Sequence, residues 1–393
     1  MGRHHFLTRL ARYFHVVWVN PAPEWREVIS PAARQGTFKG APPSPPGFSV
    51  YKPRPWMLRL YRPSWLAKYL FDKPYQQARE LLRQRGCRHI VLSFWHPRFE
   101  TVMGSVDCDL SCYHIMDEYS FSEVERPTDE VEKRIISQAD QVFVLSPGLL
   151  EKKGGINPHT DLVPDGVEFD LFSSPQPEPA DLAKINRPRI GYTGRLKKQL
   201  DWELIRSLAE QHPDWSFVFV GPLKTHREAV KVVAELSRRA NVHFLGMKSV
   251  RDVPAYTQHF DVCIMPYKVN DYTNYIYPLK LHEYLATGRP VVGSPIRSLQ
   301  EHSEILNLPS TPEDWTTAIE RALSADENAP DRRAARQAVA SQHDWKVLID
   351  RMAGIILRRL GQNSGVDFGK SLAALARARA GDGRSQPLGS PSI

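Results

Sequence analysis

The sequence predicts an α/β protein with two doubly wound domains built on parallel sheets. Short apolar runs typical of buried strands alternate with helical segments over most of the chain, which is the order that parallel sheets require. The 393 residues fit two domains at about 100–200 residues each. A Pro-rich, polar stretch, "PDGVEFDLFSSPQPEPADLAKINRP", is the expected linker between the two halves.

Composition is that of a soluble globular protein, with 41% hydrophobic and 24% charged residues. The four cysteines are too few for a disulfide framework and favour a reducing compartment. Apolar runs such as "HVVWV" and "FVFVG" are strand-length, well short of the roughly 20 residues of a membrane-spanning helix. The first residues lack an apolar signal core, so we expect a cytoplasmic protein.

Strand-like and helix-like segments alternate less regularly in the first half of the chain than in the second. Phe6, Leu10 and Phe14 recur at helical spacing and predict an opening helix, followed by the strand "HVVWVN". Residues 30–55 are rich in Pro and Gly and predict a loop. Beyond them we expect, in order, a helix, two strands, a helix and a strand: "PYQQARELLRQRG", "CRHIVLSFW", "SCYHIMDEYSF", "TDEVEKRIISQAD" and "QVFVLSP".

In the second half, strand-like and helix-like segments alternate regularly. Its expected strands are "PRIGYTG", "WSFVFVGP", "NVHFLG", "DVCIMPY" and "RPVVGSP". The helices between them are "LDWELIRSLAEQHP", "HREAVKVVAELSRRA", "DVPAYTQHF" and "PLKLHEYLATG". Two further helices, "PEDWTTAIERALSA" and "DWKVLIDRMAGIILRRL", should close the fold, and the Ala-, Arg-, Gly- and Ser-rich residues after 361 read as a flexible tail.

One helix of the second half has the chemistry of a phosphate site. In "YPLKLHEYLATGRPVVGSP", Pro278 suits the first helical position and Gly288 the C-terminal stop. Leu281 and Leu285 would share the buried side, and a polar stripe of Lys280, Glu283 and Thr287 would lie opposite.

The helix start offers free backbone N–H groups and a partial positive charge, to which Lys280 adds a full one. One turn on, the two oxygens of Glu283 suit the neighbouring hydroxyls of a ribose. Phosphate followed by ribose describes a nucleoside diphosphate, and parallel sheets bind ligands where this helix begins. The alternative is a solvated i, i+3 ion pair between Lys280 and Glu283.

The order "GYTGRL", "FVFVGP", "NVHFLG", "DVPAYTQHFDVCIMPY", "YPLKLHEYLATGRPVV" resembles the nucleotide-sugar-binding half of GT-B glycosyltransferases, most closely the bacterial exopolysaccharide branch. "HIMDEYSFSEVE" and "QADQVFVLSPGLLEKKGGINPHTDLVPDGVEFDLF" are similar to the acceptor half and linker of that group. The resemblance covers roughly residues 1–355 and implies two Rossmann-like, doubly wound domains facing a central cleft.

The resemblance also implies domain bounds and donor contacts. An acceptor-binding domain would span 1–170, a nucleotide-sugar-binding domain 171–345, a helix packing back toward the first domain 346–361, and a flexible tail 362–393. Lys280 would hold the diphosphate and Glu283 the ribose hydroxyls, with Gly194 and Arg195 facing the phosphates. The loop at Gly246 and Met247 would border the base, with Tyr267 nearby; the donor is a UDP- or GDP-sugar and no cofactor is required.

Two departures from the family pattern stand out. Many relatives carry a second glutamate eight residues before the ribose-binding one, where it contacts the donor sugar, but this chain has Tyr275 there. The sugar contact and the stereochemical outcome therefore do not carry over. Such folds also begin with a strand and a Gly-rich loop, whereas "GRHHFLTRLARYF" already reads as the first helix. We therefore hypothesise a first strand upstream.

Glycosyl transfer needs a group that accepts the acceptor hydroxyl's proton or stabilises charge at the sugar carbon. Asp117 is the first candidate, because it follows the strand "CYHIM" and the resemblance implies an acidic residue there. The alternative is a capping or loop aspartate. His96 ends another strand and could assist, or could be a structural histidine before Pro97; His4 and His5 are weaker candidates.

A zinc site at Cys108, Cys112 and His114 is a minor alternative, since no second ligand pair has suitable spacing. "GYTGRL" lacks the third glycine of a dinucleotide fingerprint. GT-B transferases typically need no bound metal, so we expect none.

The N-terminal part is basic. Residues 1–70 carry eleven Lys or Arg and two acidic residues, although the whole chain has a net charge of +8. Trp56, Tyr61, Trp65 and Tyr69 interleave with basic residues, a pattern suited to an anionic membrane surface. Nucleic acid is the alternative partner, but no nucleic-acid module is present. A third interpretation packs the two tryptophans into the domain.

These observations favour a glycosyltransferase of hexosyl or glycuronosyl type in bacterial polysaccharide biosynthesis. It would move a sugar from a nucleotide diphosphate sugar to a lipid-linked or saccharide acceptor, peripherally on the inner face of the cell membrane. The alternatives are a nucleotide-sugar epimerase of the same fold and an inactive relative that binds a nucleotide sugar or a membrane.

Overall fold

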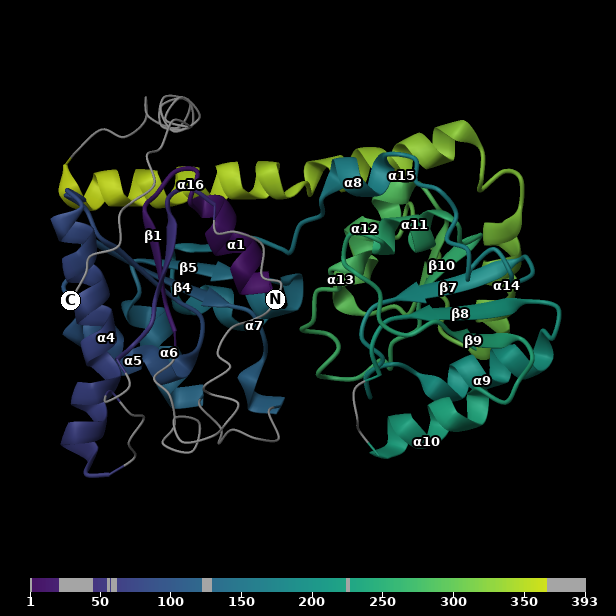
Figure 1. Ribbon diagram of the computed structural model, residues 1–393, viewed down its shortest axis with the longest axis horizontal. Coiled ribbons are helices and arrows are strands. Elements are labelled where there is room, and N and C mark those ends of the chain that lie inside the picture. The colour runs from purple at the N-terminus through teal and green to yellow at the C-terminus, as the bar shows by residue number, and fades with distance from the viewer. Residues whose placement is uncertain are drawn as a thin grey trace. The chain divides into compact units, whose positions relative to one another are not determined.

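The computed structural model describes residues 2–20, 45–54, 57, 62–121, 129–223 and 227–365 (Figure 1). The chain divides into two compact units. The first comprises residues 1–143, 153–161 and 349–393, and the second comprises 144–152 and 162–348. Each unit is a parallel-sheet α/β structure, as the alternating sequence pattern predicts.

The first unit holds two separate sheets. β1 (Val16–Val19) pairs in parallel with β2 (Phe48–Tyr51), and a second sheet has the strand order β3-β4-β5-β6. The strands of that sheet are β3 (Val91–Phe94), β4 (Leu110–Ile115), β5 (Gln141–Val144) and β6 (Thr160–Leu162). The helices of this unit are α1 (Gly2–Leu10), α4 (Ser64–Gln84), α5 (Glu100–Ser105), α6 (Asp129–Gln138) and the part of α16 (Trp345–Ser364) from residue 349 onward. α7 (Pro147–Lys153) belongs to the second unit except for its last residue.

Two sequence expectations in this unit were wrong. The predicted loop 30–55 contains β2, because "FSVY" is rich in strand-forming residues and pairs along its whole length with β1. The predicted helix "PYQQARELLRQRG" begins earlier, at Ser64, and carries Pro74 in its interior. Its end is as predicted, with Gly86 at a φ of 80° just beyond it.

A buried charge network fixes the loop after β4. Lys153 Nζ lies 2.7 Å from Glu132 and 3.1 Å from Glu118, and Tyr113 donates to Glu132 at 2.9 Å. Burial raises the pKa of both carboxyls. At Glu118 burial is the largest influence, but the Lys153 ammonium and hydrogen bonds from Ser120 together outweigh it, so the pKa is lowered. At Glu132 burial prevails over Lys153 and Tyr113, so the pKa is raised. The network therefore holds the chain next to Asp117 in one conformation.

The second unit is a five-stranded parallel sheet of order β11-β10-β7-β8-β9. Its strands are β7 (Arg189–Thr193), β8 (Ser216–Val220), β9 (Val242–Phe244), β10 (Val262–Met265) and β11 (Val291–Gly293). α9 (Trp202–Gln211) and α10 (Arg227–Leu236) lie on one side, and α11 (Val253–Gln258) and α12 (Lys280–Thr287) on the other (Figure 1). β7, β8 and β10 are fully buried, as expected for central strands covered on both faces.

Four further helices complete the second unit: α8 (Phe169–Ser173), α13 (Arg297–Gln300), α14 (Pro312–Leu323) and α15 (Pro330–Gln342). α8 lies inside the stretch expected to be a linker, and α15 was not predicted. Arg336 of α15 is fully buried and pairs with Glu327 at 2.7 Å, while it also donates to the carbonyl of Gly288 at 2.9 Å. α15 thereby holds the C-terminal end of α12.

α12 departs from the sequence expectation in two details. It begins at Lys280, so Pro278 lies before the helix and not at its first position; the Pro278 carbonyl accepts from Leu281 N at 2.9 Å. Thr287 is buried and donates to the Tyr284 carbonyl at 2.7 Å, so it is not part of an exposed polar stripe. Gly288 ends the helix at a φ of 73°, and Leu281 and Leu285 are buried, as predicted.

Candidate functional site

The strand order of the second unit creates one topological switch point. The chain leaves β7 for β8 on one side and later returns to β10 on the other. Loops that follow β7 and β10 therefore diverge to opposite faces and leave a crevice at the carboxyl ends of these two strands. Gly194 follows β7 and Tyr267 follows β10, so both lie at this edge of the sheet.

Lys280, the first residue of α12, points to that edge. Its ammonium donates to the Tyr267 hydroxyl at 2.7 Å and lies 4.9 Å from the centre of the Tyr192 ring. A Cβ atom at Gly194 would lie only 3.1 Å from Lys280 Cε, so the glycine lets the side chain approach the end of β7. Within the described residues, Lys280 forms no ion pair.

Glu283, one turn along α12, is partly exposed and accepts no hydrogen bond from any described residue. Burial raises its pKa to about 7; the Lys280 charge opposes this rise and the Asp165 carboxylate adds to it. The solvated i, i+3 pair between Lys280 and Glu283 does not form among these residues, because Lys280 turns to Tyr267 instead. A positive group and a free carboxylate are thus presented side by side.

Tyr284 holds α12 against the sheet. Its hydroxyl accepts from the Thr193 backbone N–H at 2.8 Å, at the end of β7. The residue is completely buried, so the hydrogen bond is shielded from water. Sequence reasoning missed this positioning residue, because a tyrosine on the buried side of a helix is usually interpreted as a residue of the hydrophobic core.

The segment "VPDG" contributes a second unassigned carboxylate. Asp165 is buried, its Oδ1 atom has no partner among the described residues, and burial raises its pKa to about 7. The next residue, Gly166, packs tightly on Trp345 and the His343 carbonyl, where a Cβ would approach within 3.0 Å. Nothing in the sequence pattern separates Asp165 from a linker residue.

The other residues that were predicted to contact the nucleotide-sugar donor lie along the same edge of the sheet. Gly221 follows β8 and donates to the Gly246 carbonyl at 2.8 Å, while Gly194 donates to the Val220 carbonyl at 2.8 Å. Met247 is 77% exposed. Arg195 is exposed, and its carbonyl accepts from the Tyr192 hydroxyl at 3.2 Å. The structure thus brings Gly194, Tyr267 and Lys280 together, with Glu283 beside them. Arg195 and Met247 are exposed and lie outside this group.

Tyr275 belongs to a loop that packs on the start of α7. Its carbonyl accepts from Ser146 Oγ at 2.6 Å, and Lys152 Nζ lies 4.9 Å from the centre of its ring. Gly148 is required below this loop, because a Cβ there would lie 2.4 Å from the Asn274 carbonyl oxygen. A tyrosine therefore occupies the position where many relatives have glutamate, on a firmly held loop.

In the first unit, Asp117 and His96 follow β4 and β3, which are neighbours in the sheet. Asp117 is partly exposed, and its Oδ1 accepts from the Glu118 backbone N–H at 2.9 Å. His96 is buried, and its Nδ1 accepts from the Arg98 N–H at 3.1 Å, capping a short 3-10 turn. Tyr119 links the two strand ends: its ring contacts His96, and its hydroxyl donates to the Trp95 carbonyl at 2.8 Å.

The minor zinc interpretation finds no geometric support in the described part of the chain, where no group of three or more His, Cys, Asp or Glu could hold a metal ion. His114 is fully buried, with its ring centre 4.2 Å from that of Trp95. The side chain of His4 lies outside the described part of the chain, whereas the His5 carbonyl accepts from Arg9 Nη1 at 3.1 Å.

A sequence comparison matches part of the second unit to a known family. Residues 187–325 match the family model for Glycosyl transferases group 1. A teichuronic acid biosynthesis glycosyltransferase, TuaH of Bacillus subtilis (strain 168), is 35% identical over 243 residues, which are 55% of this chain and 56% of that protein. The chain thus spans about half the length of this curated relative.

Structural comparisons extend over both units. The sucrose-phosphate synthase of Thermosynechococcus elongatus matches 92% of this chain and 93% of its own with a TM-score of 0.65 at 20% identity. The Anabaena protein Alr3699/HepE, solved with UDP and glucose, matches 87% of this chain and 99% of its own with a TM-score of 0.61 at 16% identity. These likenesses establish the fold and confirm the predicted GT-B, two-domain α/β class.

The resemblance to bacterial glycosyltransferases is confirmed by the family match and the curated relative. No helix among the described residues is long and apolar enough to span a bilayer.

Proposed function

We propose that this chain, which carries a group 1 glycosyltransferase domain at residues 187–325, transfers a sugar from a nucleotide diphosphate sugar to a saccharide or lipid-linked acceptor. Its setting would be bacterial polysaccharide biosynthesis, a proposal supported by the Bacillus relative, which is named for teichuronic acid biosynthesis. The reaction replaces the bond between the sugar's anomeric carbon and the diphosphate by a bond to an acceptor hydroxyl, which loses its proton.

The observation that carries this proposal is the placement of Lys280 at the switch point, with Glu283 one helical turn away. The ammonium and the N-terminus of α12 offer positive charge to a diphosphate. As the sugar leaves, negative charge builds up on that diphosphate, so the same groups would stabilise the transition state more than the ground state. Glu283, whose carboxylate has no partner among the described residues, would accept from the ribose hydroxyls.

The donor would be UDP- or GDP-linked. The Anabaena structure was solved with UDP and glucose, and a trehalose-6-phosphate structure from E. coli with UDP-2-fluoro glucose, which favours uridine for this chain. The Met247 loop would border the base, because it leaves the sheet next to the phosphate edge and is largely exposed. With Tyr275 in place of glutamate, the sugar would be recognised by other groups, and Asp165 is one buried carboxylate in the second unit that is free to do so.

The acceptor would be activated in the first unit. Asp117 is the group we assign to accept the acceptor's proton, since it follows a buried strand, is partly exposed and sits on a loop fixed by the Lys153 network. His96 already uses Nδ1 as a backbone cap, so it would assist only through its other ring nitrogen.

We further propose that the first unit meets an anionic membrane surface, where a lipid-linked acceptor would lie. Trp65 and Tyr69 are 70% and 52% exposed one turn apart on α4, so packing of Trp65 into the domain is excluded. Lys68 and Lys73 accompany them, the latter 5.6 Å from the centre of the Tyr69 ring. Trp56, Arg59 and Tyr61 lie outside the described residues.

Acceptor-dependent release of nucleotide tests the function. The chain would be incubated with UDP-glucose, UDP-glucuronate, UDP-N-acetylglucosamine and GDP-mannose, each with and without lipid extracted from bacterial membranes. We expect UDP release from one donor only when lipid is present, and loss of that release in Asp117→Asn with nucleotide affinity retained. Formation of an epimeric sugar nucleotide without lipid would instead identify an epimerase, and nucleotide binding without either reaction an inactive relative.

A further inference from the structure

The second unit has a pocket at the edge of its sheet opposite to Lys280. Helices of a parallel α/β sheet end where the next strands begin, and α11, α12 and α14 all end at this edge. The pocket is open to solvent and has a volume of about 720 Å³. Its lining consists of Arg187, Pro188, Asp261, Arg289, Leu323, Ser324, Ala325 and Asn328, and shares no residue with the proposed donor site.

Arg289 is the partly buried cation of this pocket. It lies in the turn between the end of α12 and the start of β11, and its Nε donates to the Gln258 carbonyl at 2.7 Å. Among the described residues, no carboxylate lies within ion-pairing distance of its guanidinium. A partly buried charge without a counter-charge costs free energy, so this arrangement calls for an explanation.

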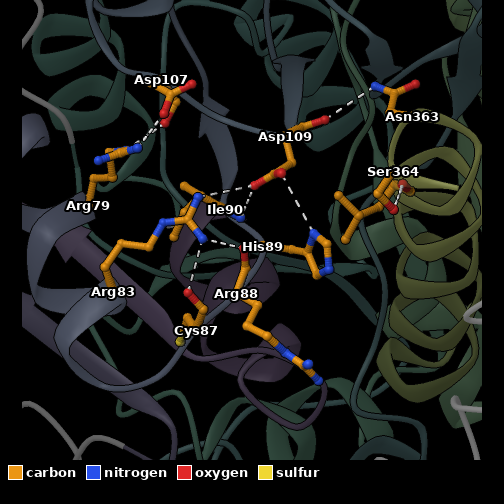
Figure 2. Close-up of polar contacts among 11 residues, drawn as sticks. Arg79, Arg83, Cys87, Arg88, His89, Ile90, Asp107, Asp109, Asn363 and Ser364 are labelled. Atoms are coloured by element: carbon orange, nitrogen blue, oxygen red, sulfur yellow. Dashed lines mark hydrogen bonds and ion pairs between the residues drawn. The ribbon is translucent and has the colours of Figure 1, made fainter. Parts of the chain in front are cut away.

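Partly buried arginines of α4 show the usual arrangement (Figure 2). Arg79 forms an ion pair with Asp107 and also donates to the carbonyl of that residue at 2.8 Å. Arg83 lies 3.6 Å from the Asp109 carboxylate. In both cases a carboxylate compensates the guanidinium charge, whereas the charge of Arg289 is left for a group from outside the described part of the chain.

A second arginine adds to this charge. Arg333 of α15 packs along Gly288, where a Cβ would lie 3.3 Å from Arg333 Cβ and 3.4 Å from its Nε. Arg333 is exposed, and its guanidinium forms no hydrogen bond or ion pair with a described residue. Burial is the main cause that lowers the pKa of Arg289, and the charge of Arg333 contributes to the lowering. Two like charges thus lie near each other without an anion.

The other charges at this edge are paired. Asp261, the carboxylate in the pocket lining, forms an ion pair with Arg187 and accepts from the Arg189 N–H at 2.7 Å. Glu178 forms an ion pair with Arg189 and lies 3.8 Å from Arg187. These two acidic and two basic residues balance one another. The charge that remains is that of the two arginines beside the end of α12.

The helix ends suggest a simpler role for these arginines, because carbonyls at a helix C-terminus carry partial negative charge and attract cations. Arg336 has this role at the end of α12, and Glu327 balances its charge at 2.7 Å. Arg289 also holds a helix-end carbonyl, but a guanidinium has five N–H donors and can donate to a ligand as well. The Arg333 side chain donates to no carbonyl among the described residues. The helix-end role therefore leaves most of the donors of this pair unexplained.

We propose that this pocket binds a soluble phosphate monoester through the guanidiniums of Arg289 and Arg333. A phosphate monoester carries a charge of about −1.5 to −2 near pH 7, which matches two uncompensated arginines. Guanidinium groups bind phosphate oxygens through paired, charge-assisted N–H donors. The hydroxyl of Ser324, in the lining, is a further donor. This site is separate from the donor site and does not depend on the proposed transferase activity.

A soluble ester fits the pocket better than a lipid headgroup does. The apolar part of the lining is Pro188, Leu323 and Ala325, and none of them is among the exposed large apolar side chains of the described residues. A headgroup site at a membrane surface is normally accompanied by exposed aromatic or aliphatic side chains, such as Trp65 and Tyr69 on α4. The small apolar wall is sufficient for the organic part of a compact ester.

Calorimetric titration of the full chain with inorganic phosphate and with glycerol 3-phosphate, at constant ionic strength, tests the proposal. The host is Lys280→Ala, because phosphate could also bind to the Lys280 ammonium. We expect saturable binding of both probes to this host, and about tenfold weaker binding when Arg333→Gln is added. Arg333 is exposed and has no described side-chain hydrogen bond, so this variant should fold.

Arg251→Gln in the same host is the matched control, since Arg251 is an exposed arginine elsewhere in the second unit. Its phosphate affinity should equal that of the host. Equal affinities of the Arg333 and Arg251 variants, or no saturable phosphate binding to the host, would overturn the proposal. Neither result would bear on nucleotide binding at the start of α12, which is measured separately.

Nitrogen-15 NMR of the arginine Nε–H signals would locate the ligand, with Arg289→Lys used to assign the Arg289 signal. We expect phosphate to shift this signal, and acetate at the same ionic strength to shift it less, because acetate carries a single charge. An Arg289 signal that phosphate leaves unchanged would overturn the proposal, as would an equal shift with acetate. A shift produced by phosphatidic acid vesicles but not by the soluble probes would make the pocket a lipid headgroup site and also overturn it.

Discussion

Lys280 donates a hydrogen bond to Tyr267 at 2.7 Å, and this contact joins the first residue of α12 to the end of β10. It aims the ammonium across the switch point toward Gly194, at the end of β7. The ammonium has three protons, so it can donate to a ligand while it keeps its hydrogen bond to Tyr267. The positive group is therefore pre-positioned, which lowers the entropy that diphosphate binding would have to overcome.

Gly194→Ala should weaken nucleotide binding more than it should weaken folding. Gly194 has a φ of 130°, and the added methyl would press on Lys280 Cε at 3.1 Å. We expect backbone strain of about 1–3 kcal/mol, measured by urea unfolding, and about a tenfold weaker affinity for UDP or GDP by calorimetry. Gly86→Ala is the matched control: its φ is 80° but the added Cβ meets nothing within 4 Å. Equal losses of stability with unchanged nucleotide affinity would contradict the phosphate role of this edge.

Glu283→Gln should stabilise the free protein and weaken the complex. The folded-state pKa of Glu283 is raised from 4.5 to about 7, so the native state holds a proton that the unfolded state releases between these values. Stability from this group is present below pH 4.5 and is lost as pH rises through about 7. We expect the variant's Tm to exceed that of the native chain at pH 8, and the difference to shrink toward pH 5.

The nucleotide affinity of Glu283→Gln should fall at pH 8, because an amide oxygen accepts from ribose hydroxyls less strongly than a carboxylate. Glu304→Gln, at an exposed position of the same unit, is the control and should change neither quantity. A Tm difference that does not vary with pH would show that Glu283 is not titrating in this range.

Lys153→Met should severely destabilise the first unit. The substitution preserves volume but leaves Glu118 and Glu132 as two buried carboxyls without their shared cation. Removing one partner from a buried pair costs about 3–5 kcal/mol, which urea unfolding would detect. Lys133→Met, in the exposed pair with Glu130, should cost under about 1 kcal/mol. Similar costs at both sites would mean that the Lys153 network does not hold the loop beside Asp117.

Trp65→Ala with Tyr69→Ala should reduce binding to vesicles containing phosphatidylglycerol. Both side chains are exposed on α4 and flanked by lysines, so we expect about a tenfold weaker partition in co-sedimentation. Met247→Ala removes a comparably exposed apolar side chain from the other unit and should leave partition unchanged. Unchanged binding of the double variant to the phosphatidylglycerol vesicles would indicate that α4 is not the contact.

Local signals were sufficient to predict α12 and the strands beside it. Gly288 marked the end of α12, and Leu281 and Leu285 marked its buried side. Runs of β-branched residues marked the central strands. Long-range pairing was out of reach: "FSVY" lies in a Pro- and Gly-rich stretch and becomes β2 only because β1 accepts it. α15 was missed because its sequence is polar, and its docking depends on the buried Arg336.

The candidate site was only partly predictable, because some of its contacts join residues that are far apart in the sequence. Lys280 and Glu283 stood out as a polar pair on one helix, but the partner that aims Lys280, Tyr267, comes from another strand and had been assigned only a neighbouring role. Asp165 and Tyr284 gave no signal, since their importance lies in burial and in contacts across the sheet edge.

The most direct test of the central claim is ligand-induced stabilisation by UDP, GDP and ADP for the native chain, Lys280→Ala and the exposed control Lys268→Ala. A nucleotide at 100 times its dissociation constant stabilises by about 2.7 kcal/mol, which is a measurable rise in Tm. We predict stabilisation by one nucleoside diphosphate in the native chain and in Lys268→Ala, and its loss in Lys280→Ala. Equal stabilisation of all three proteins would contradict a donor site at the start of α12.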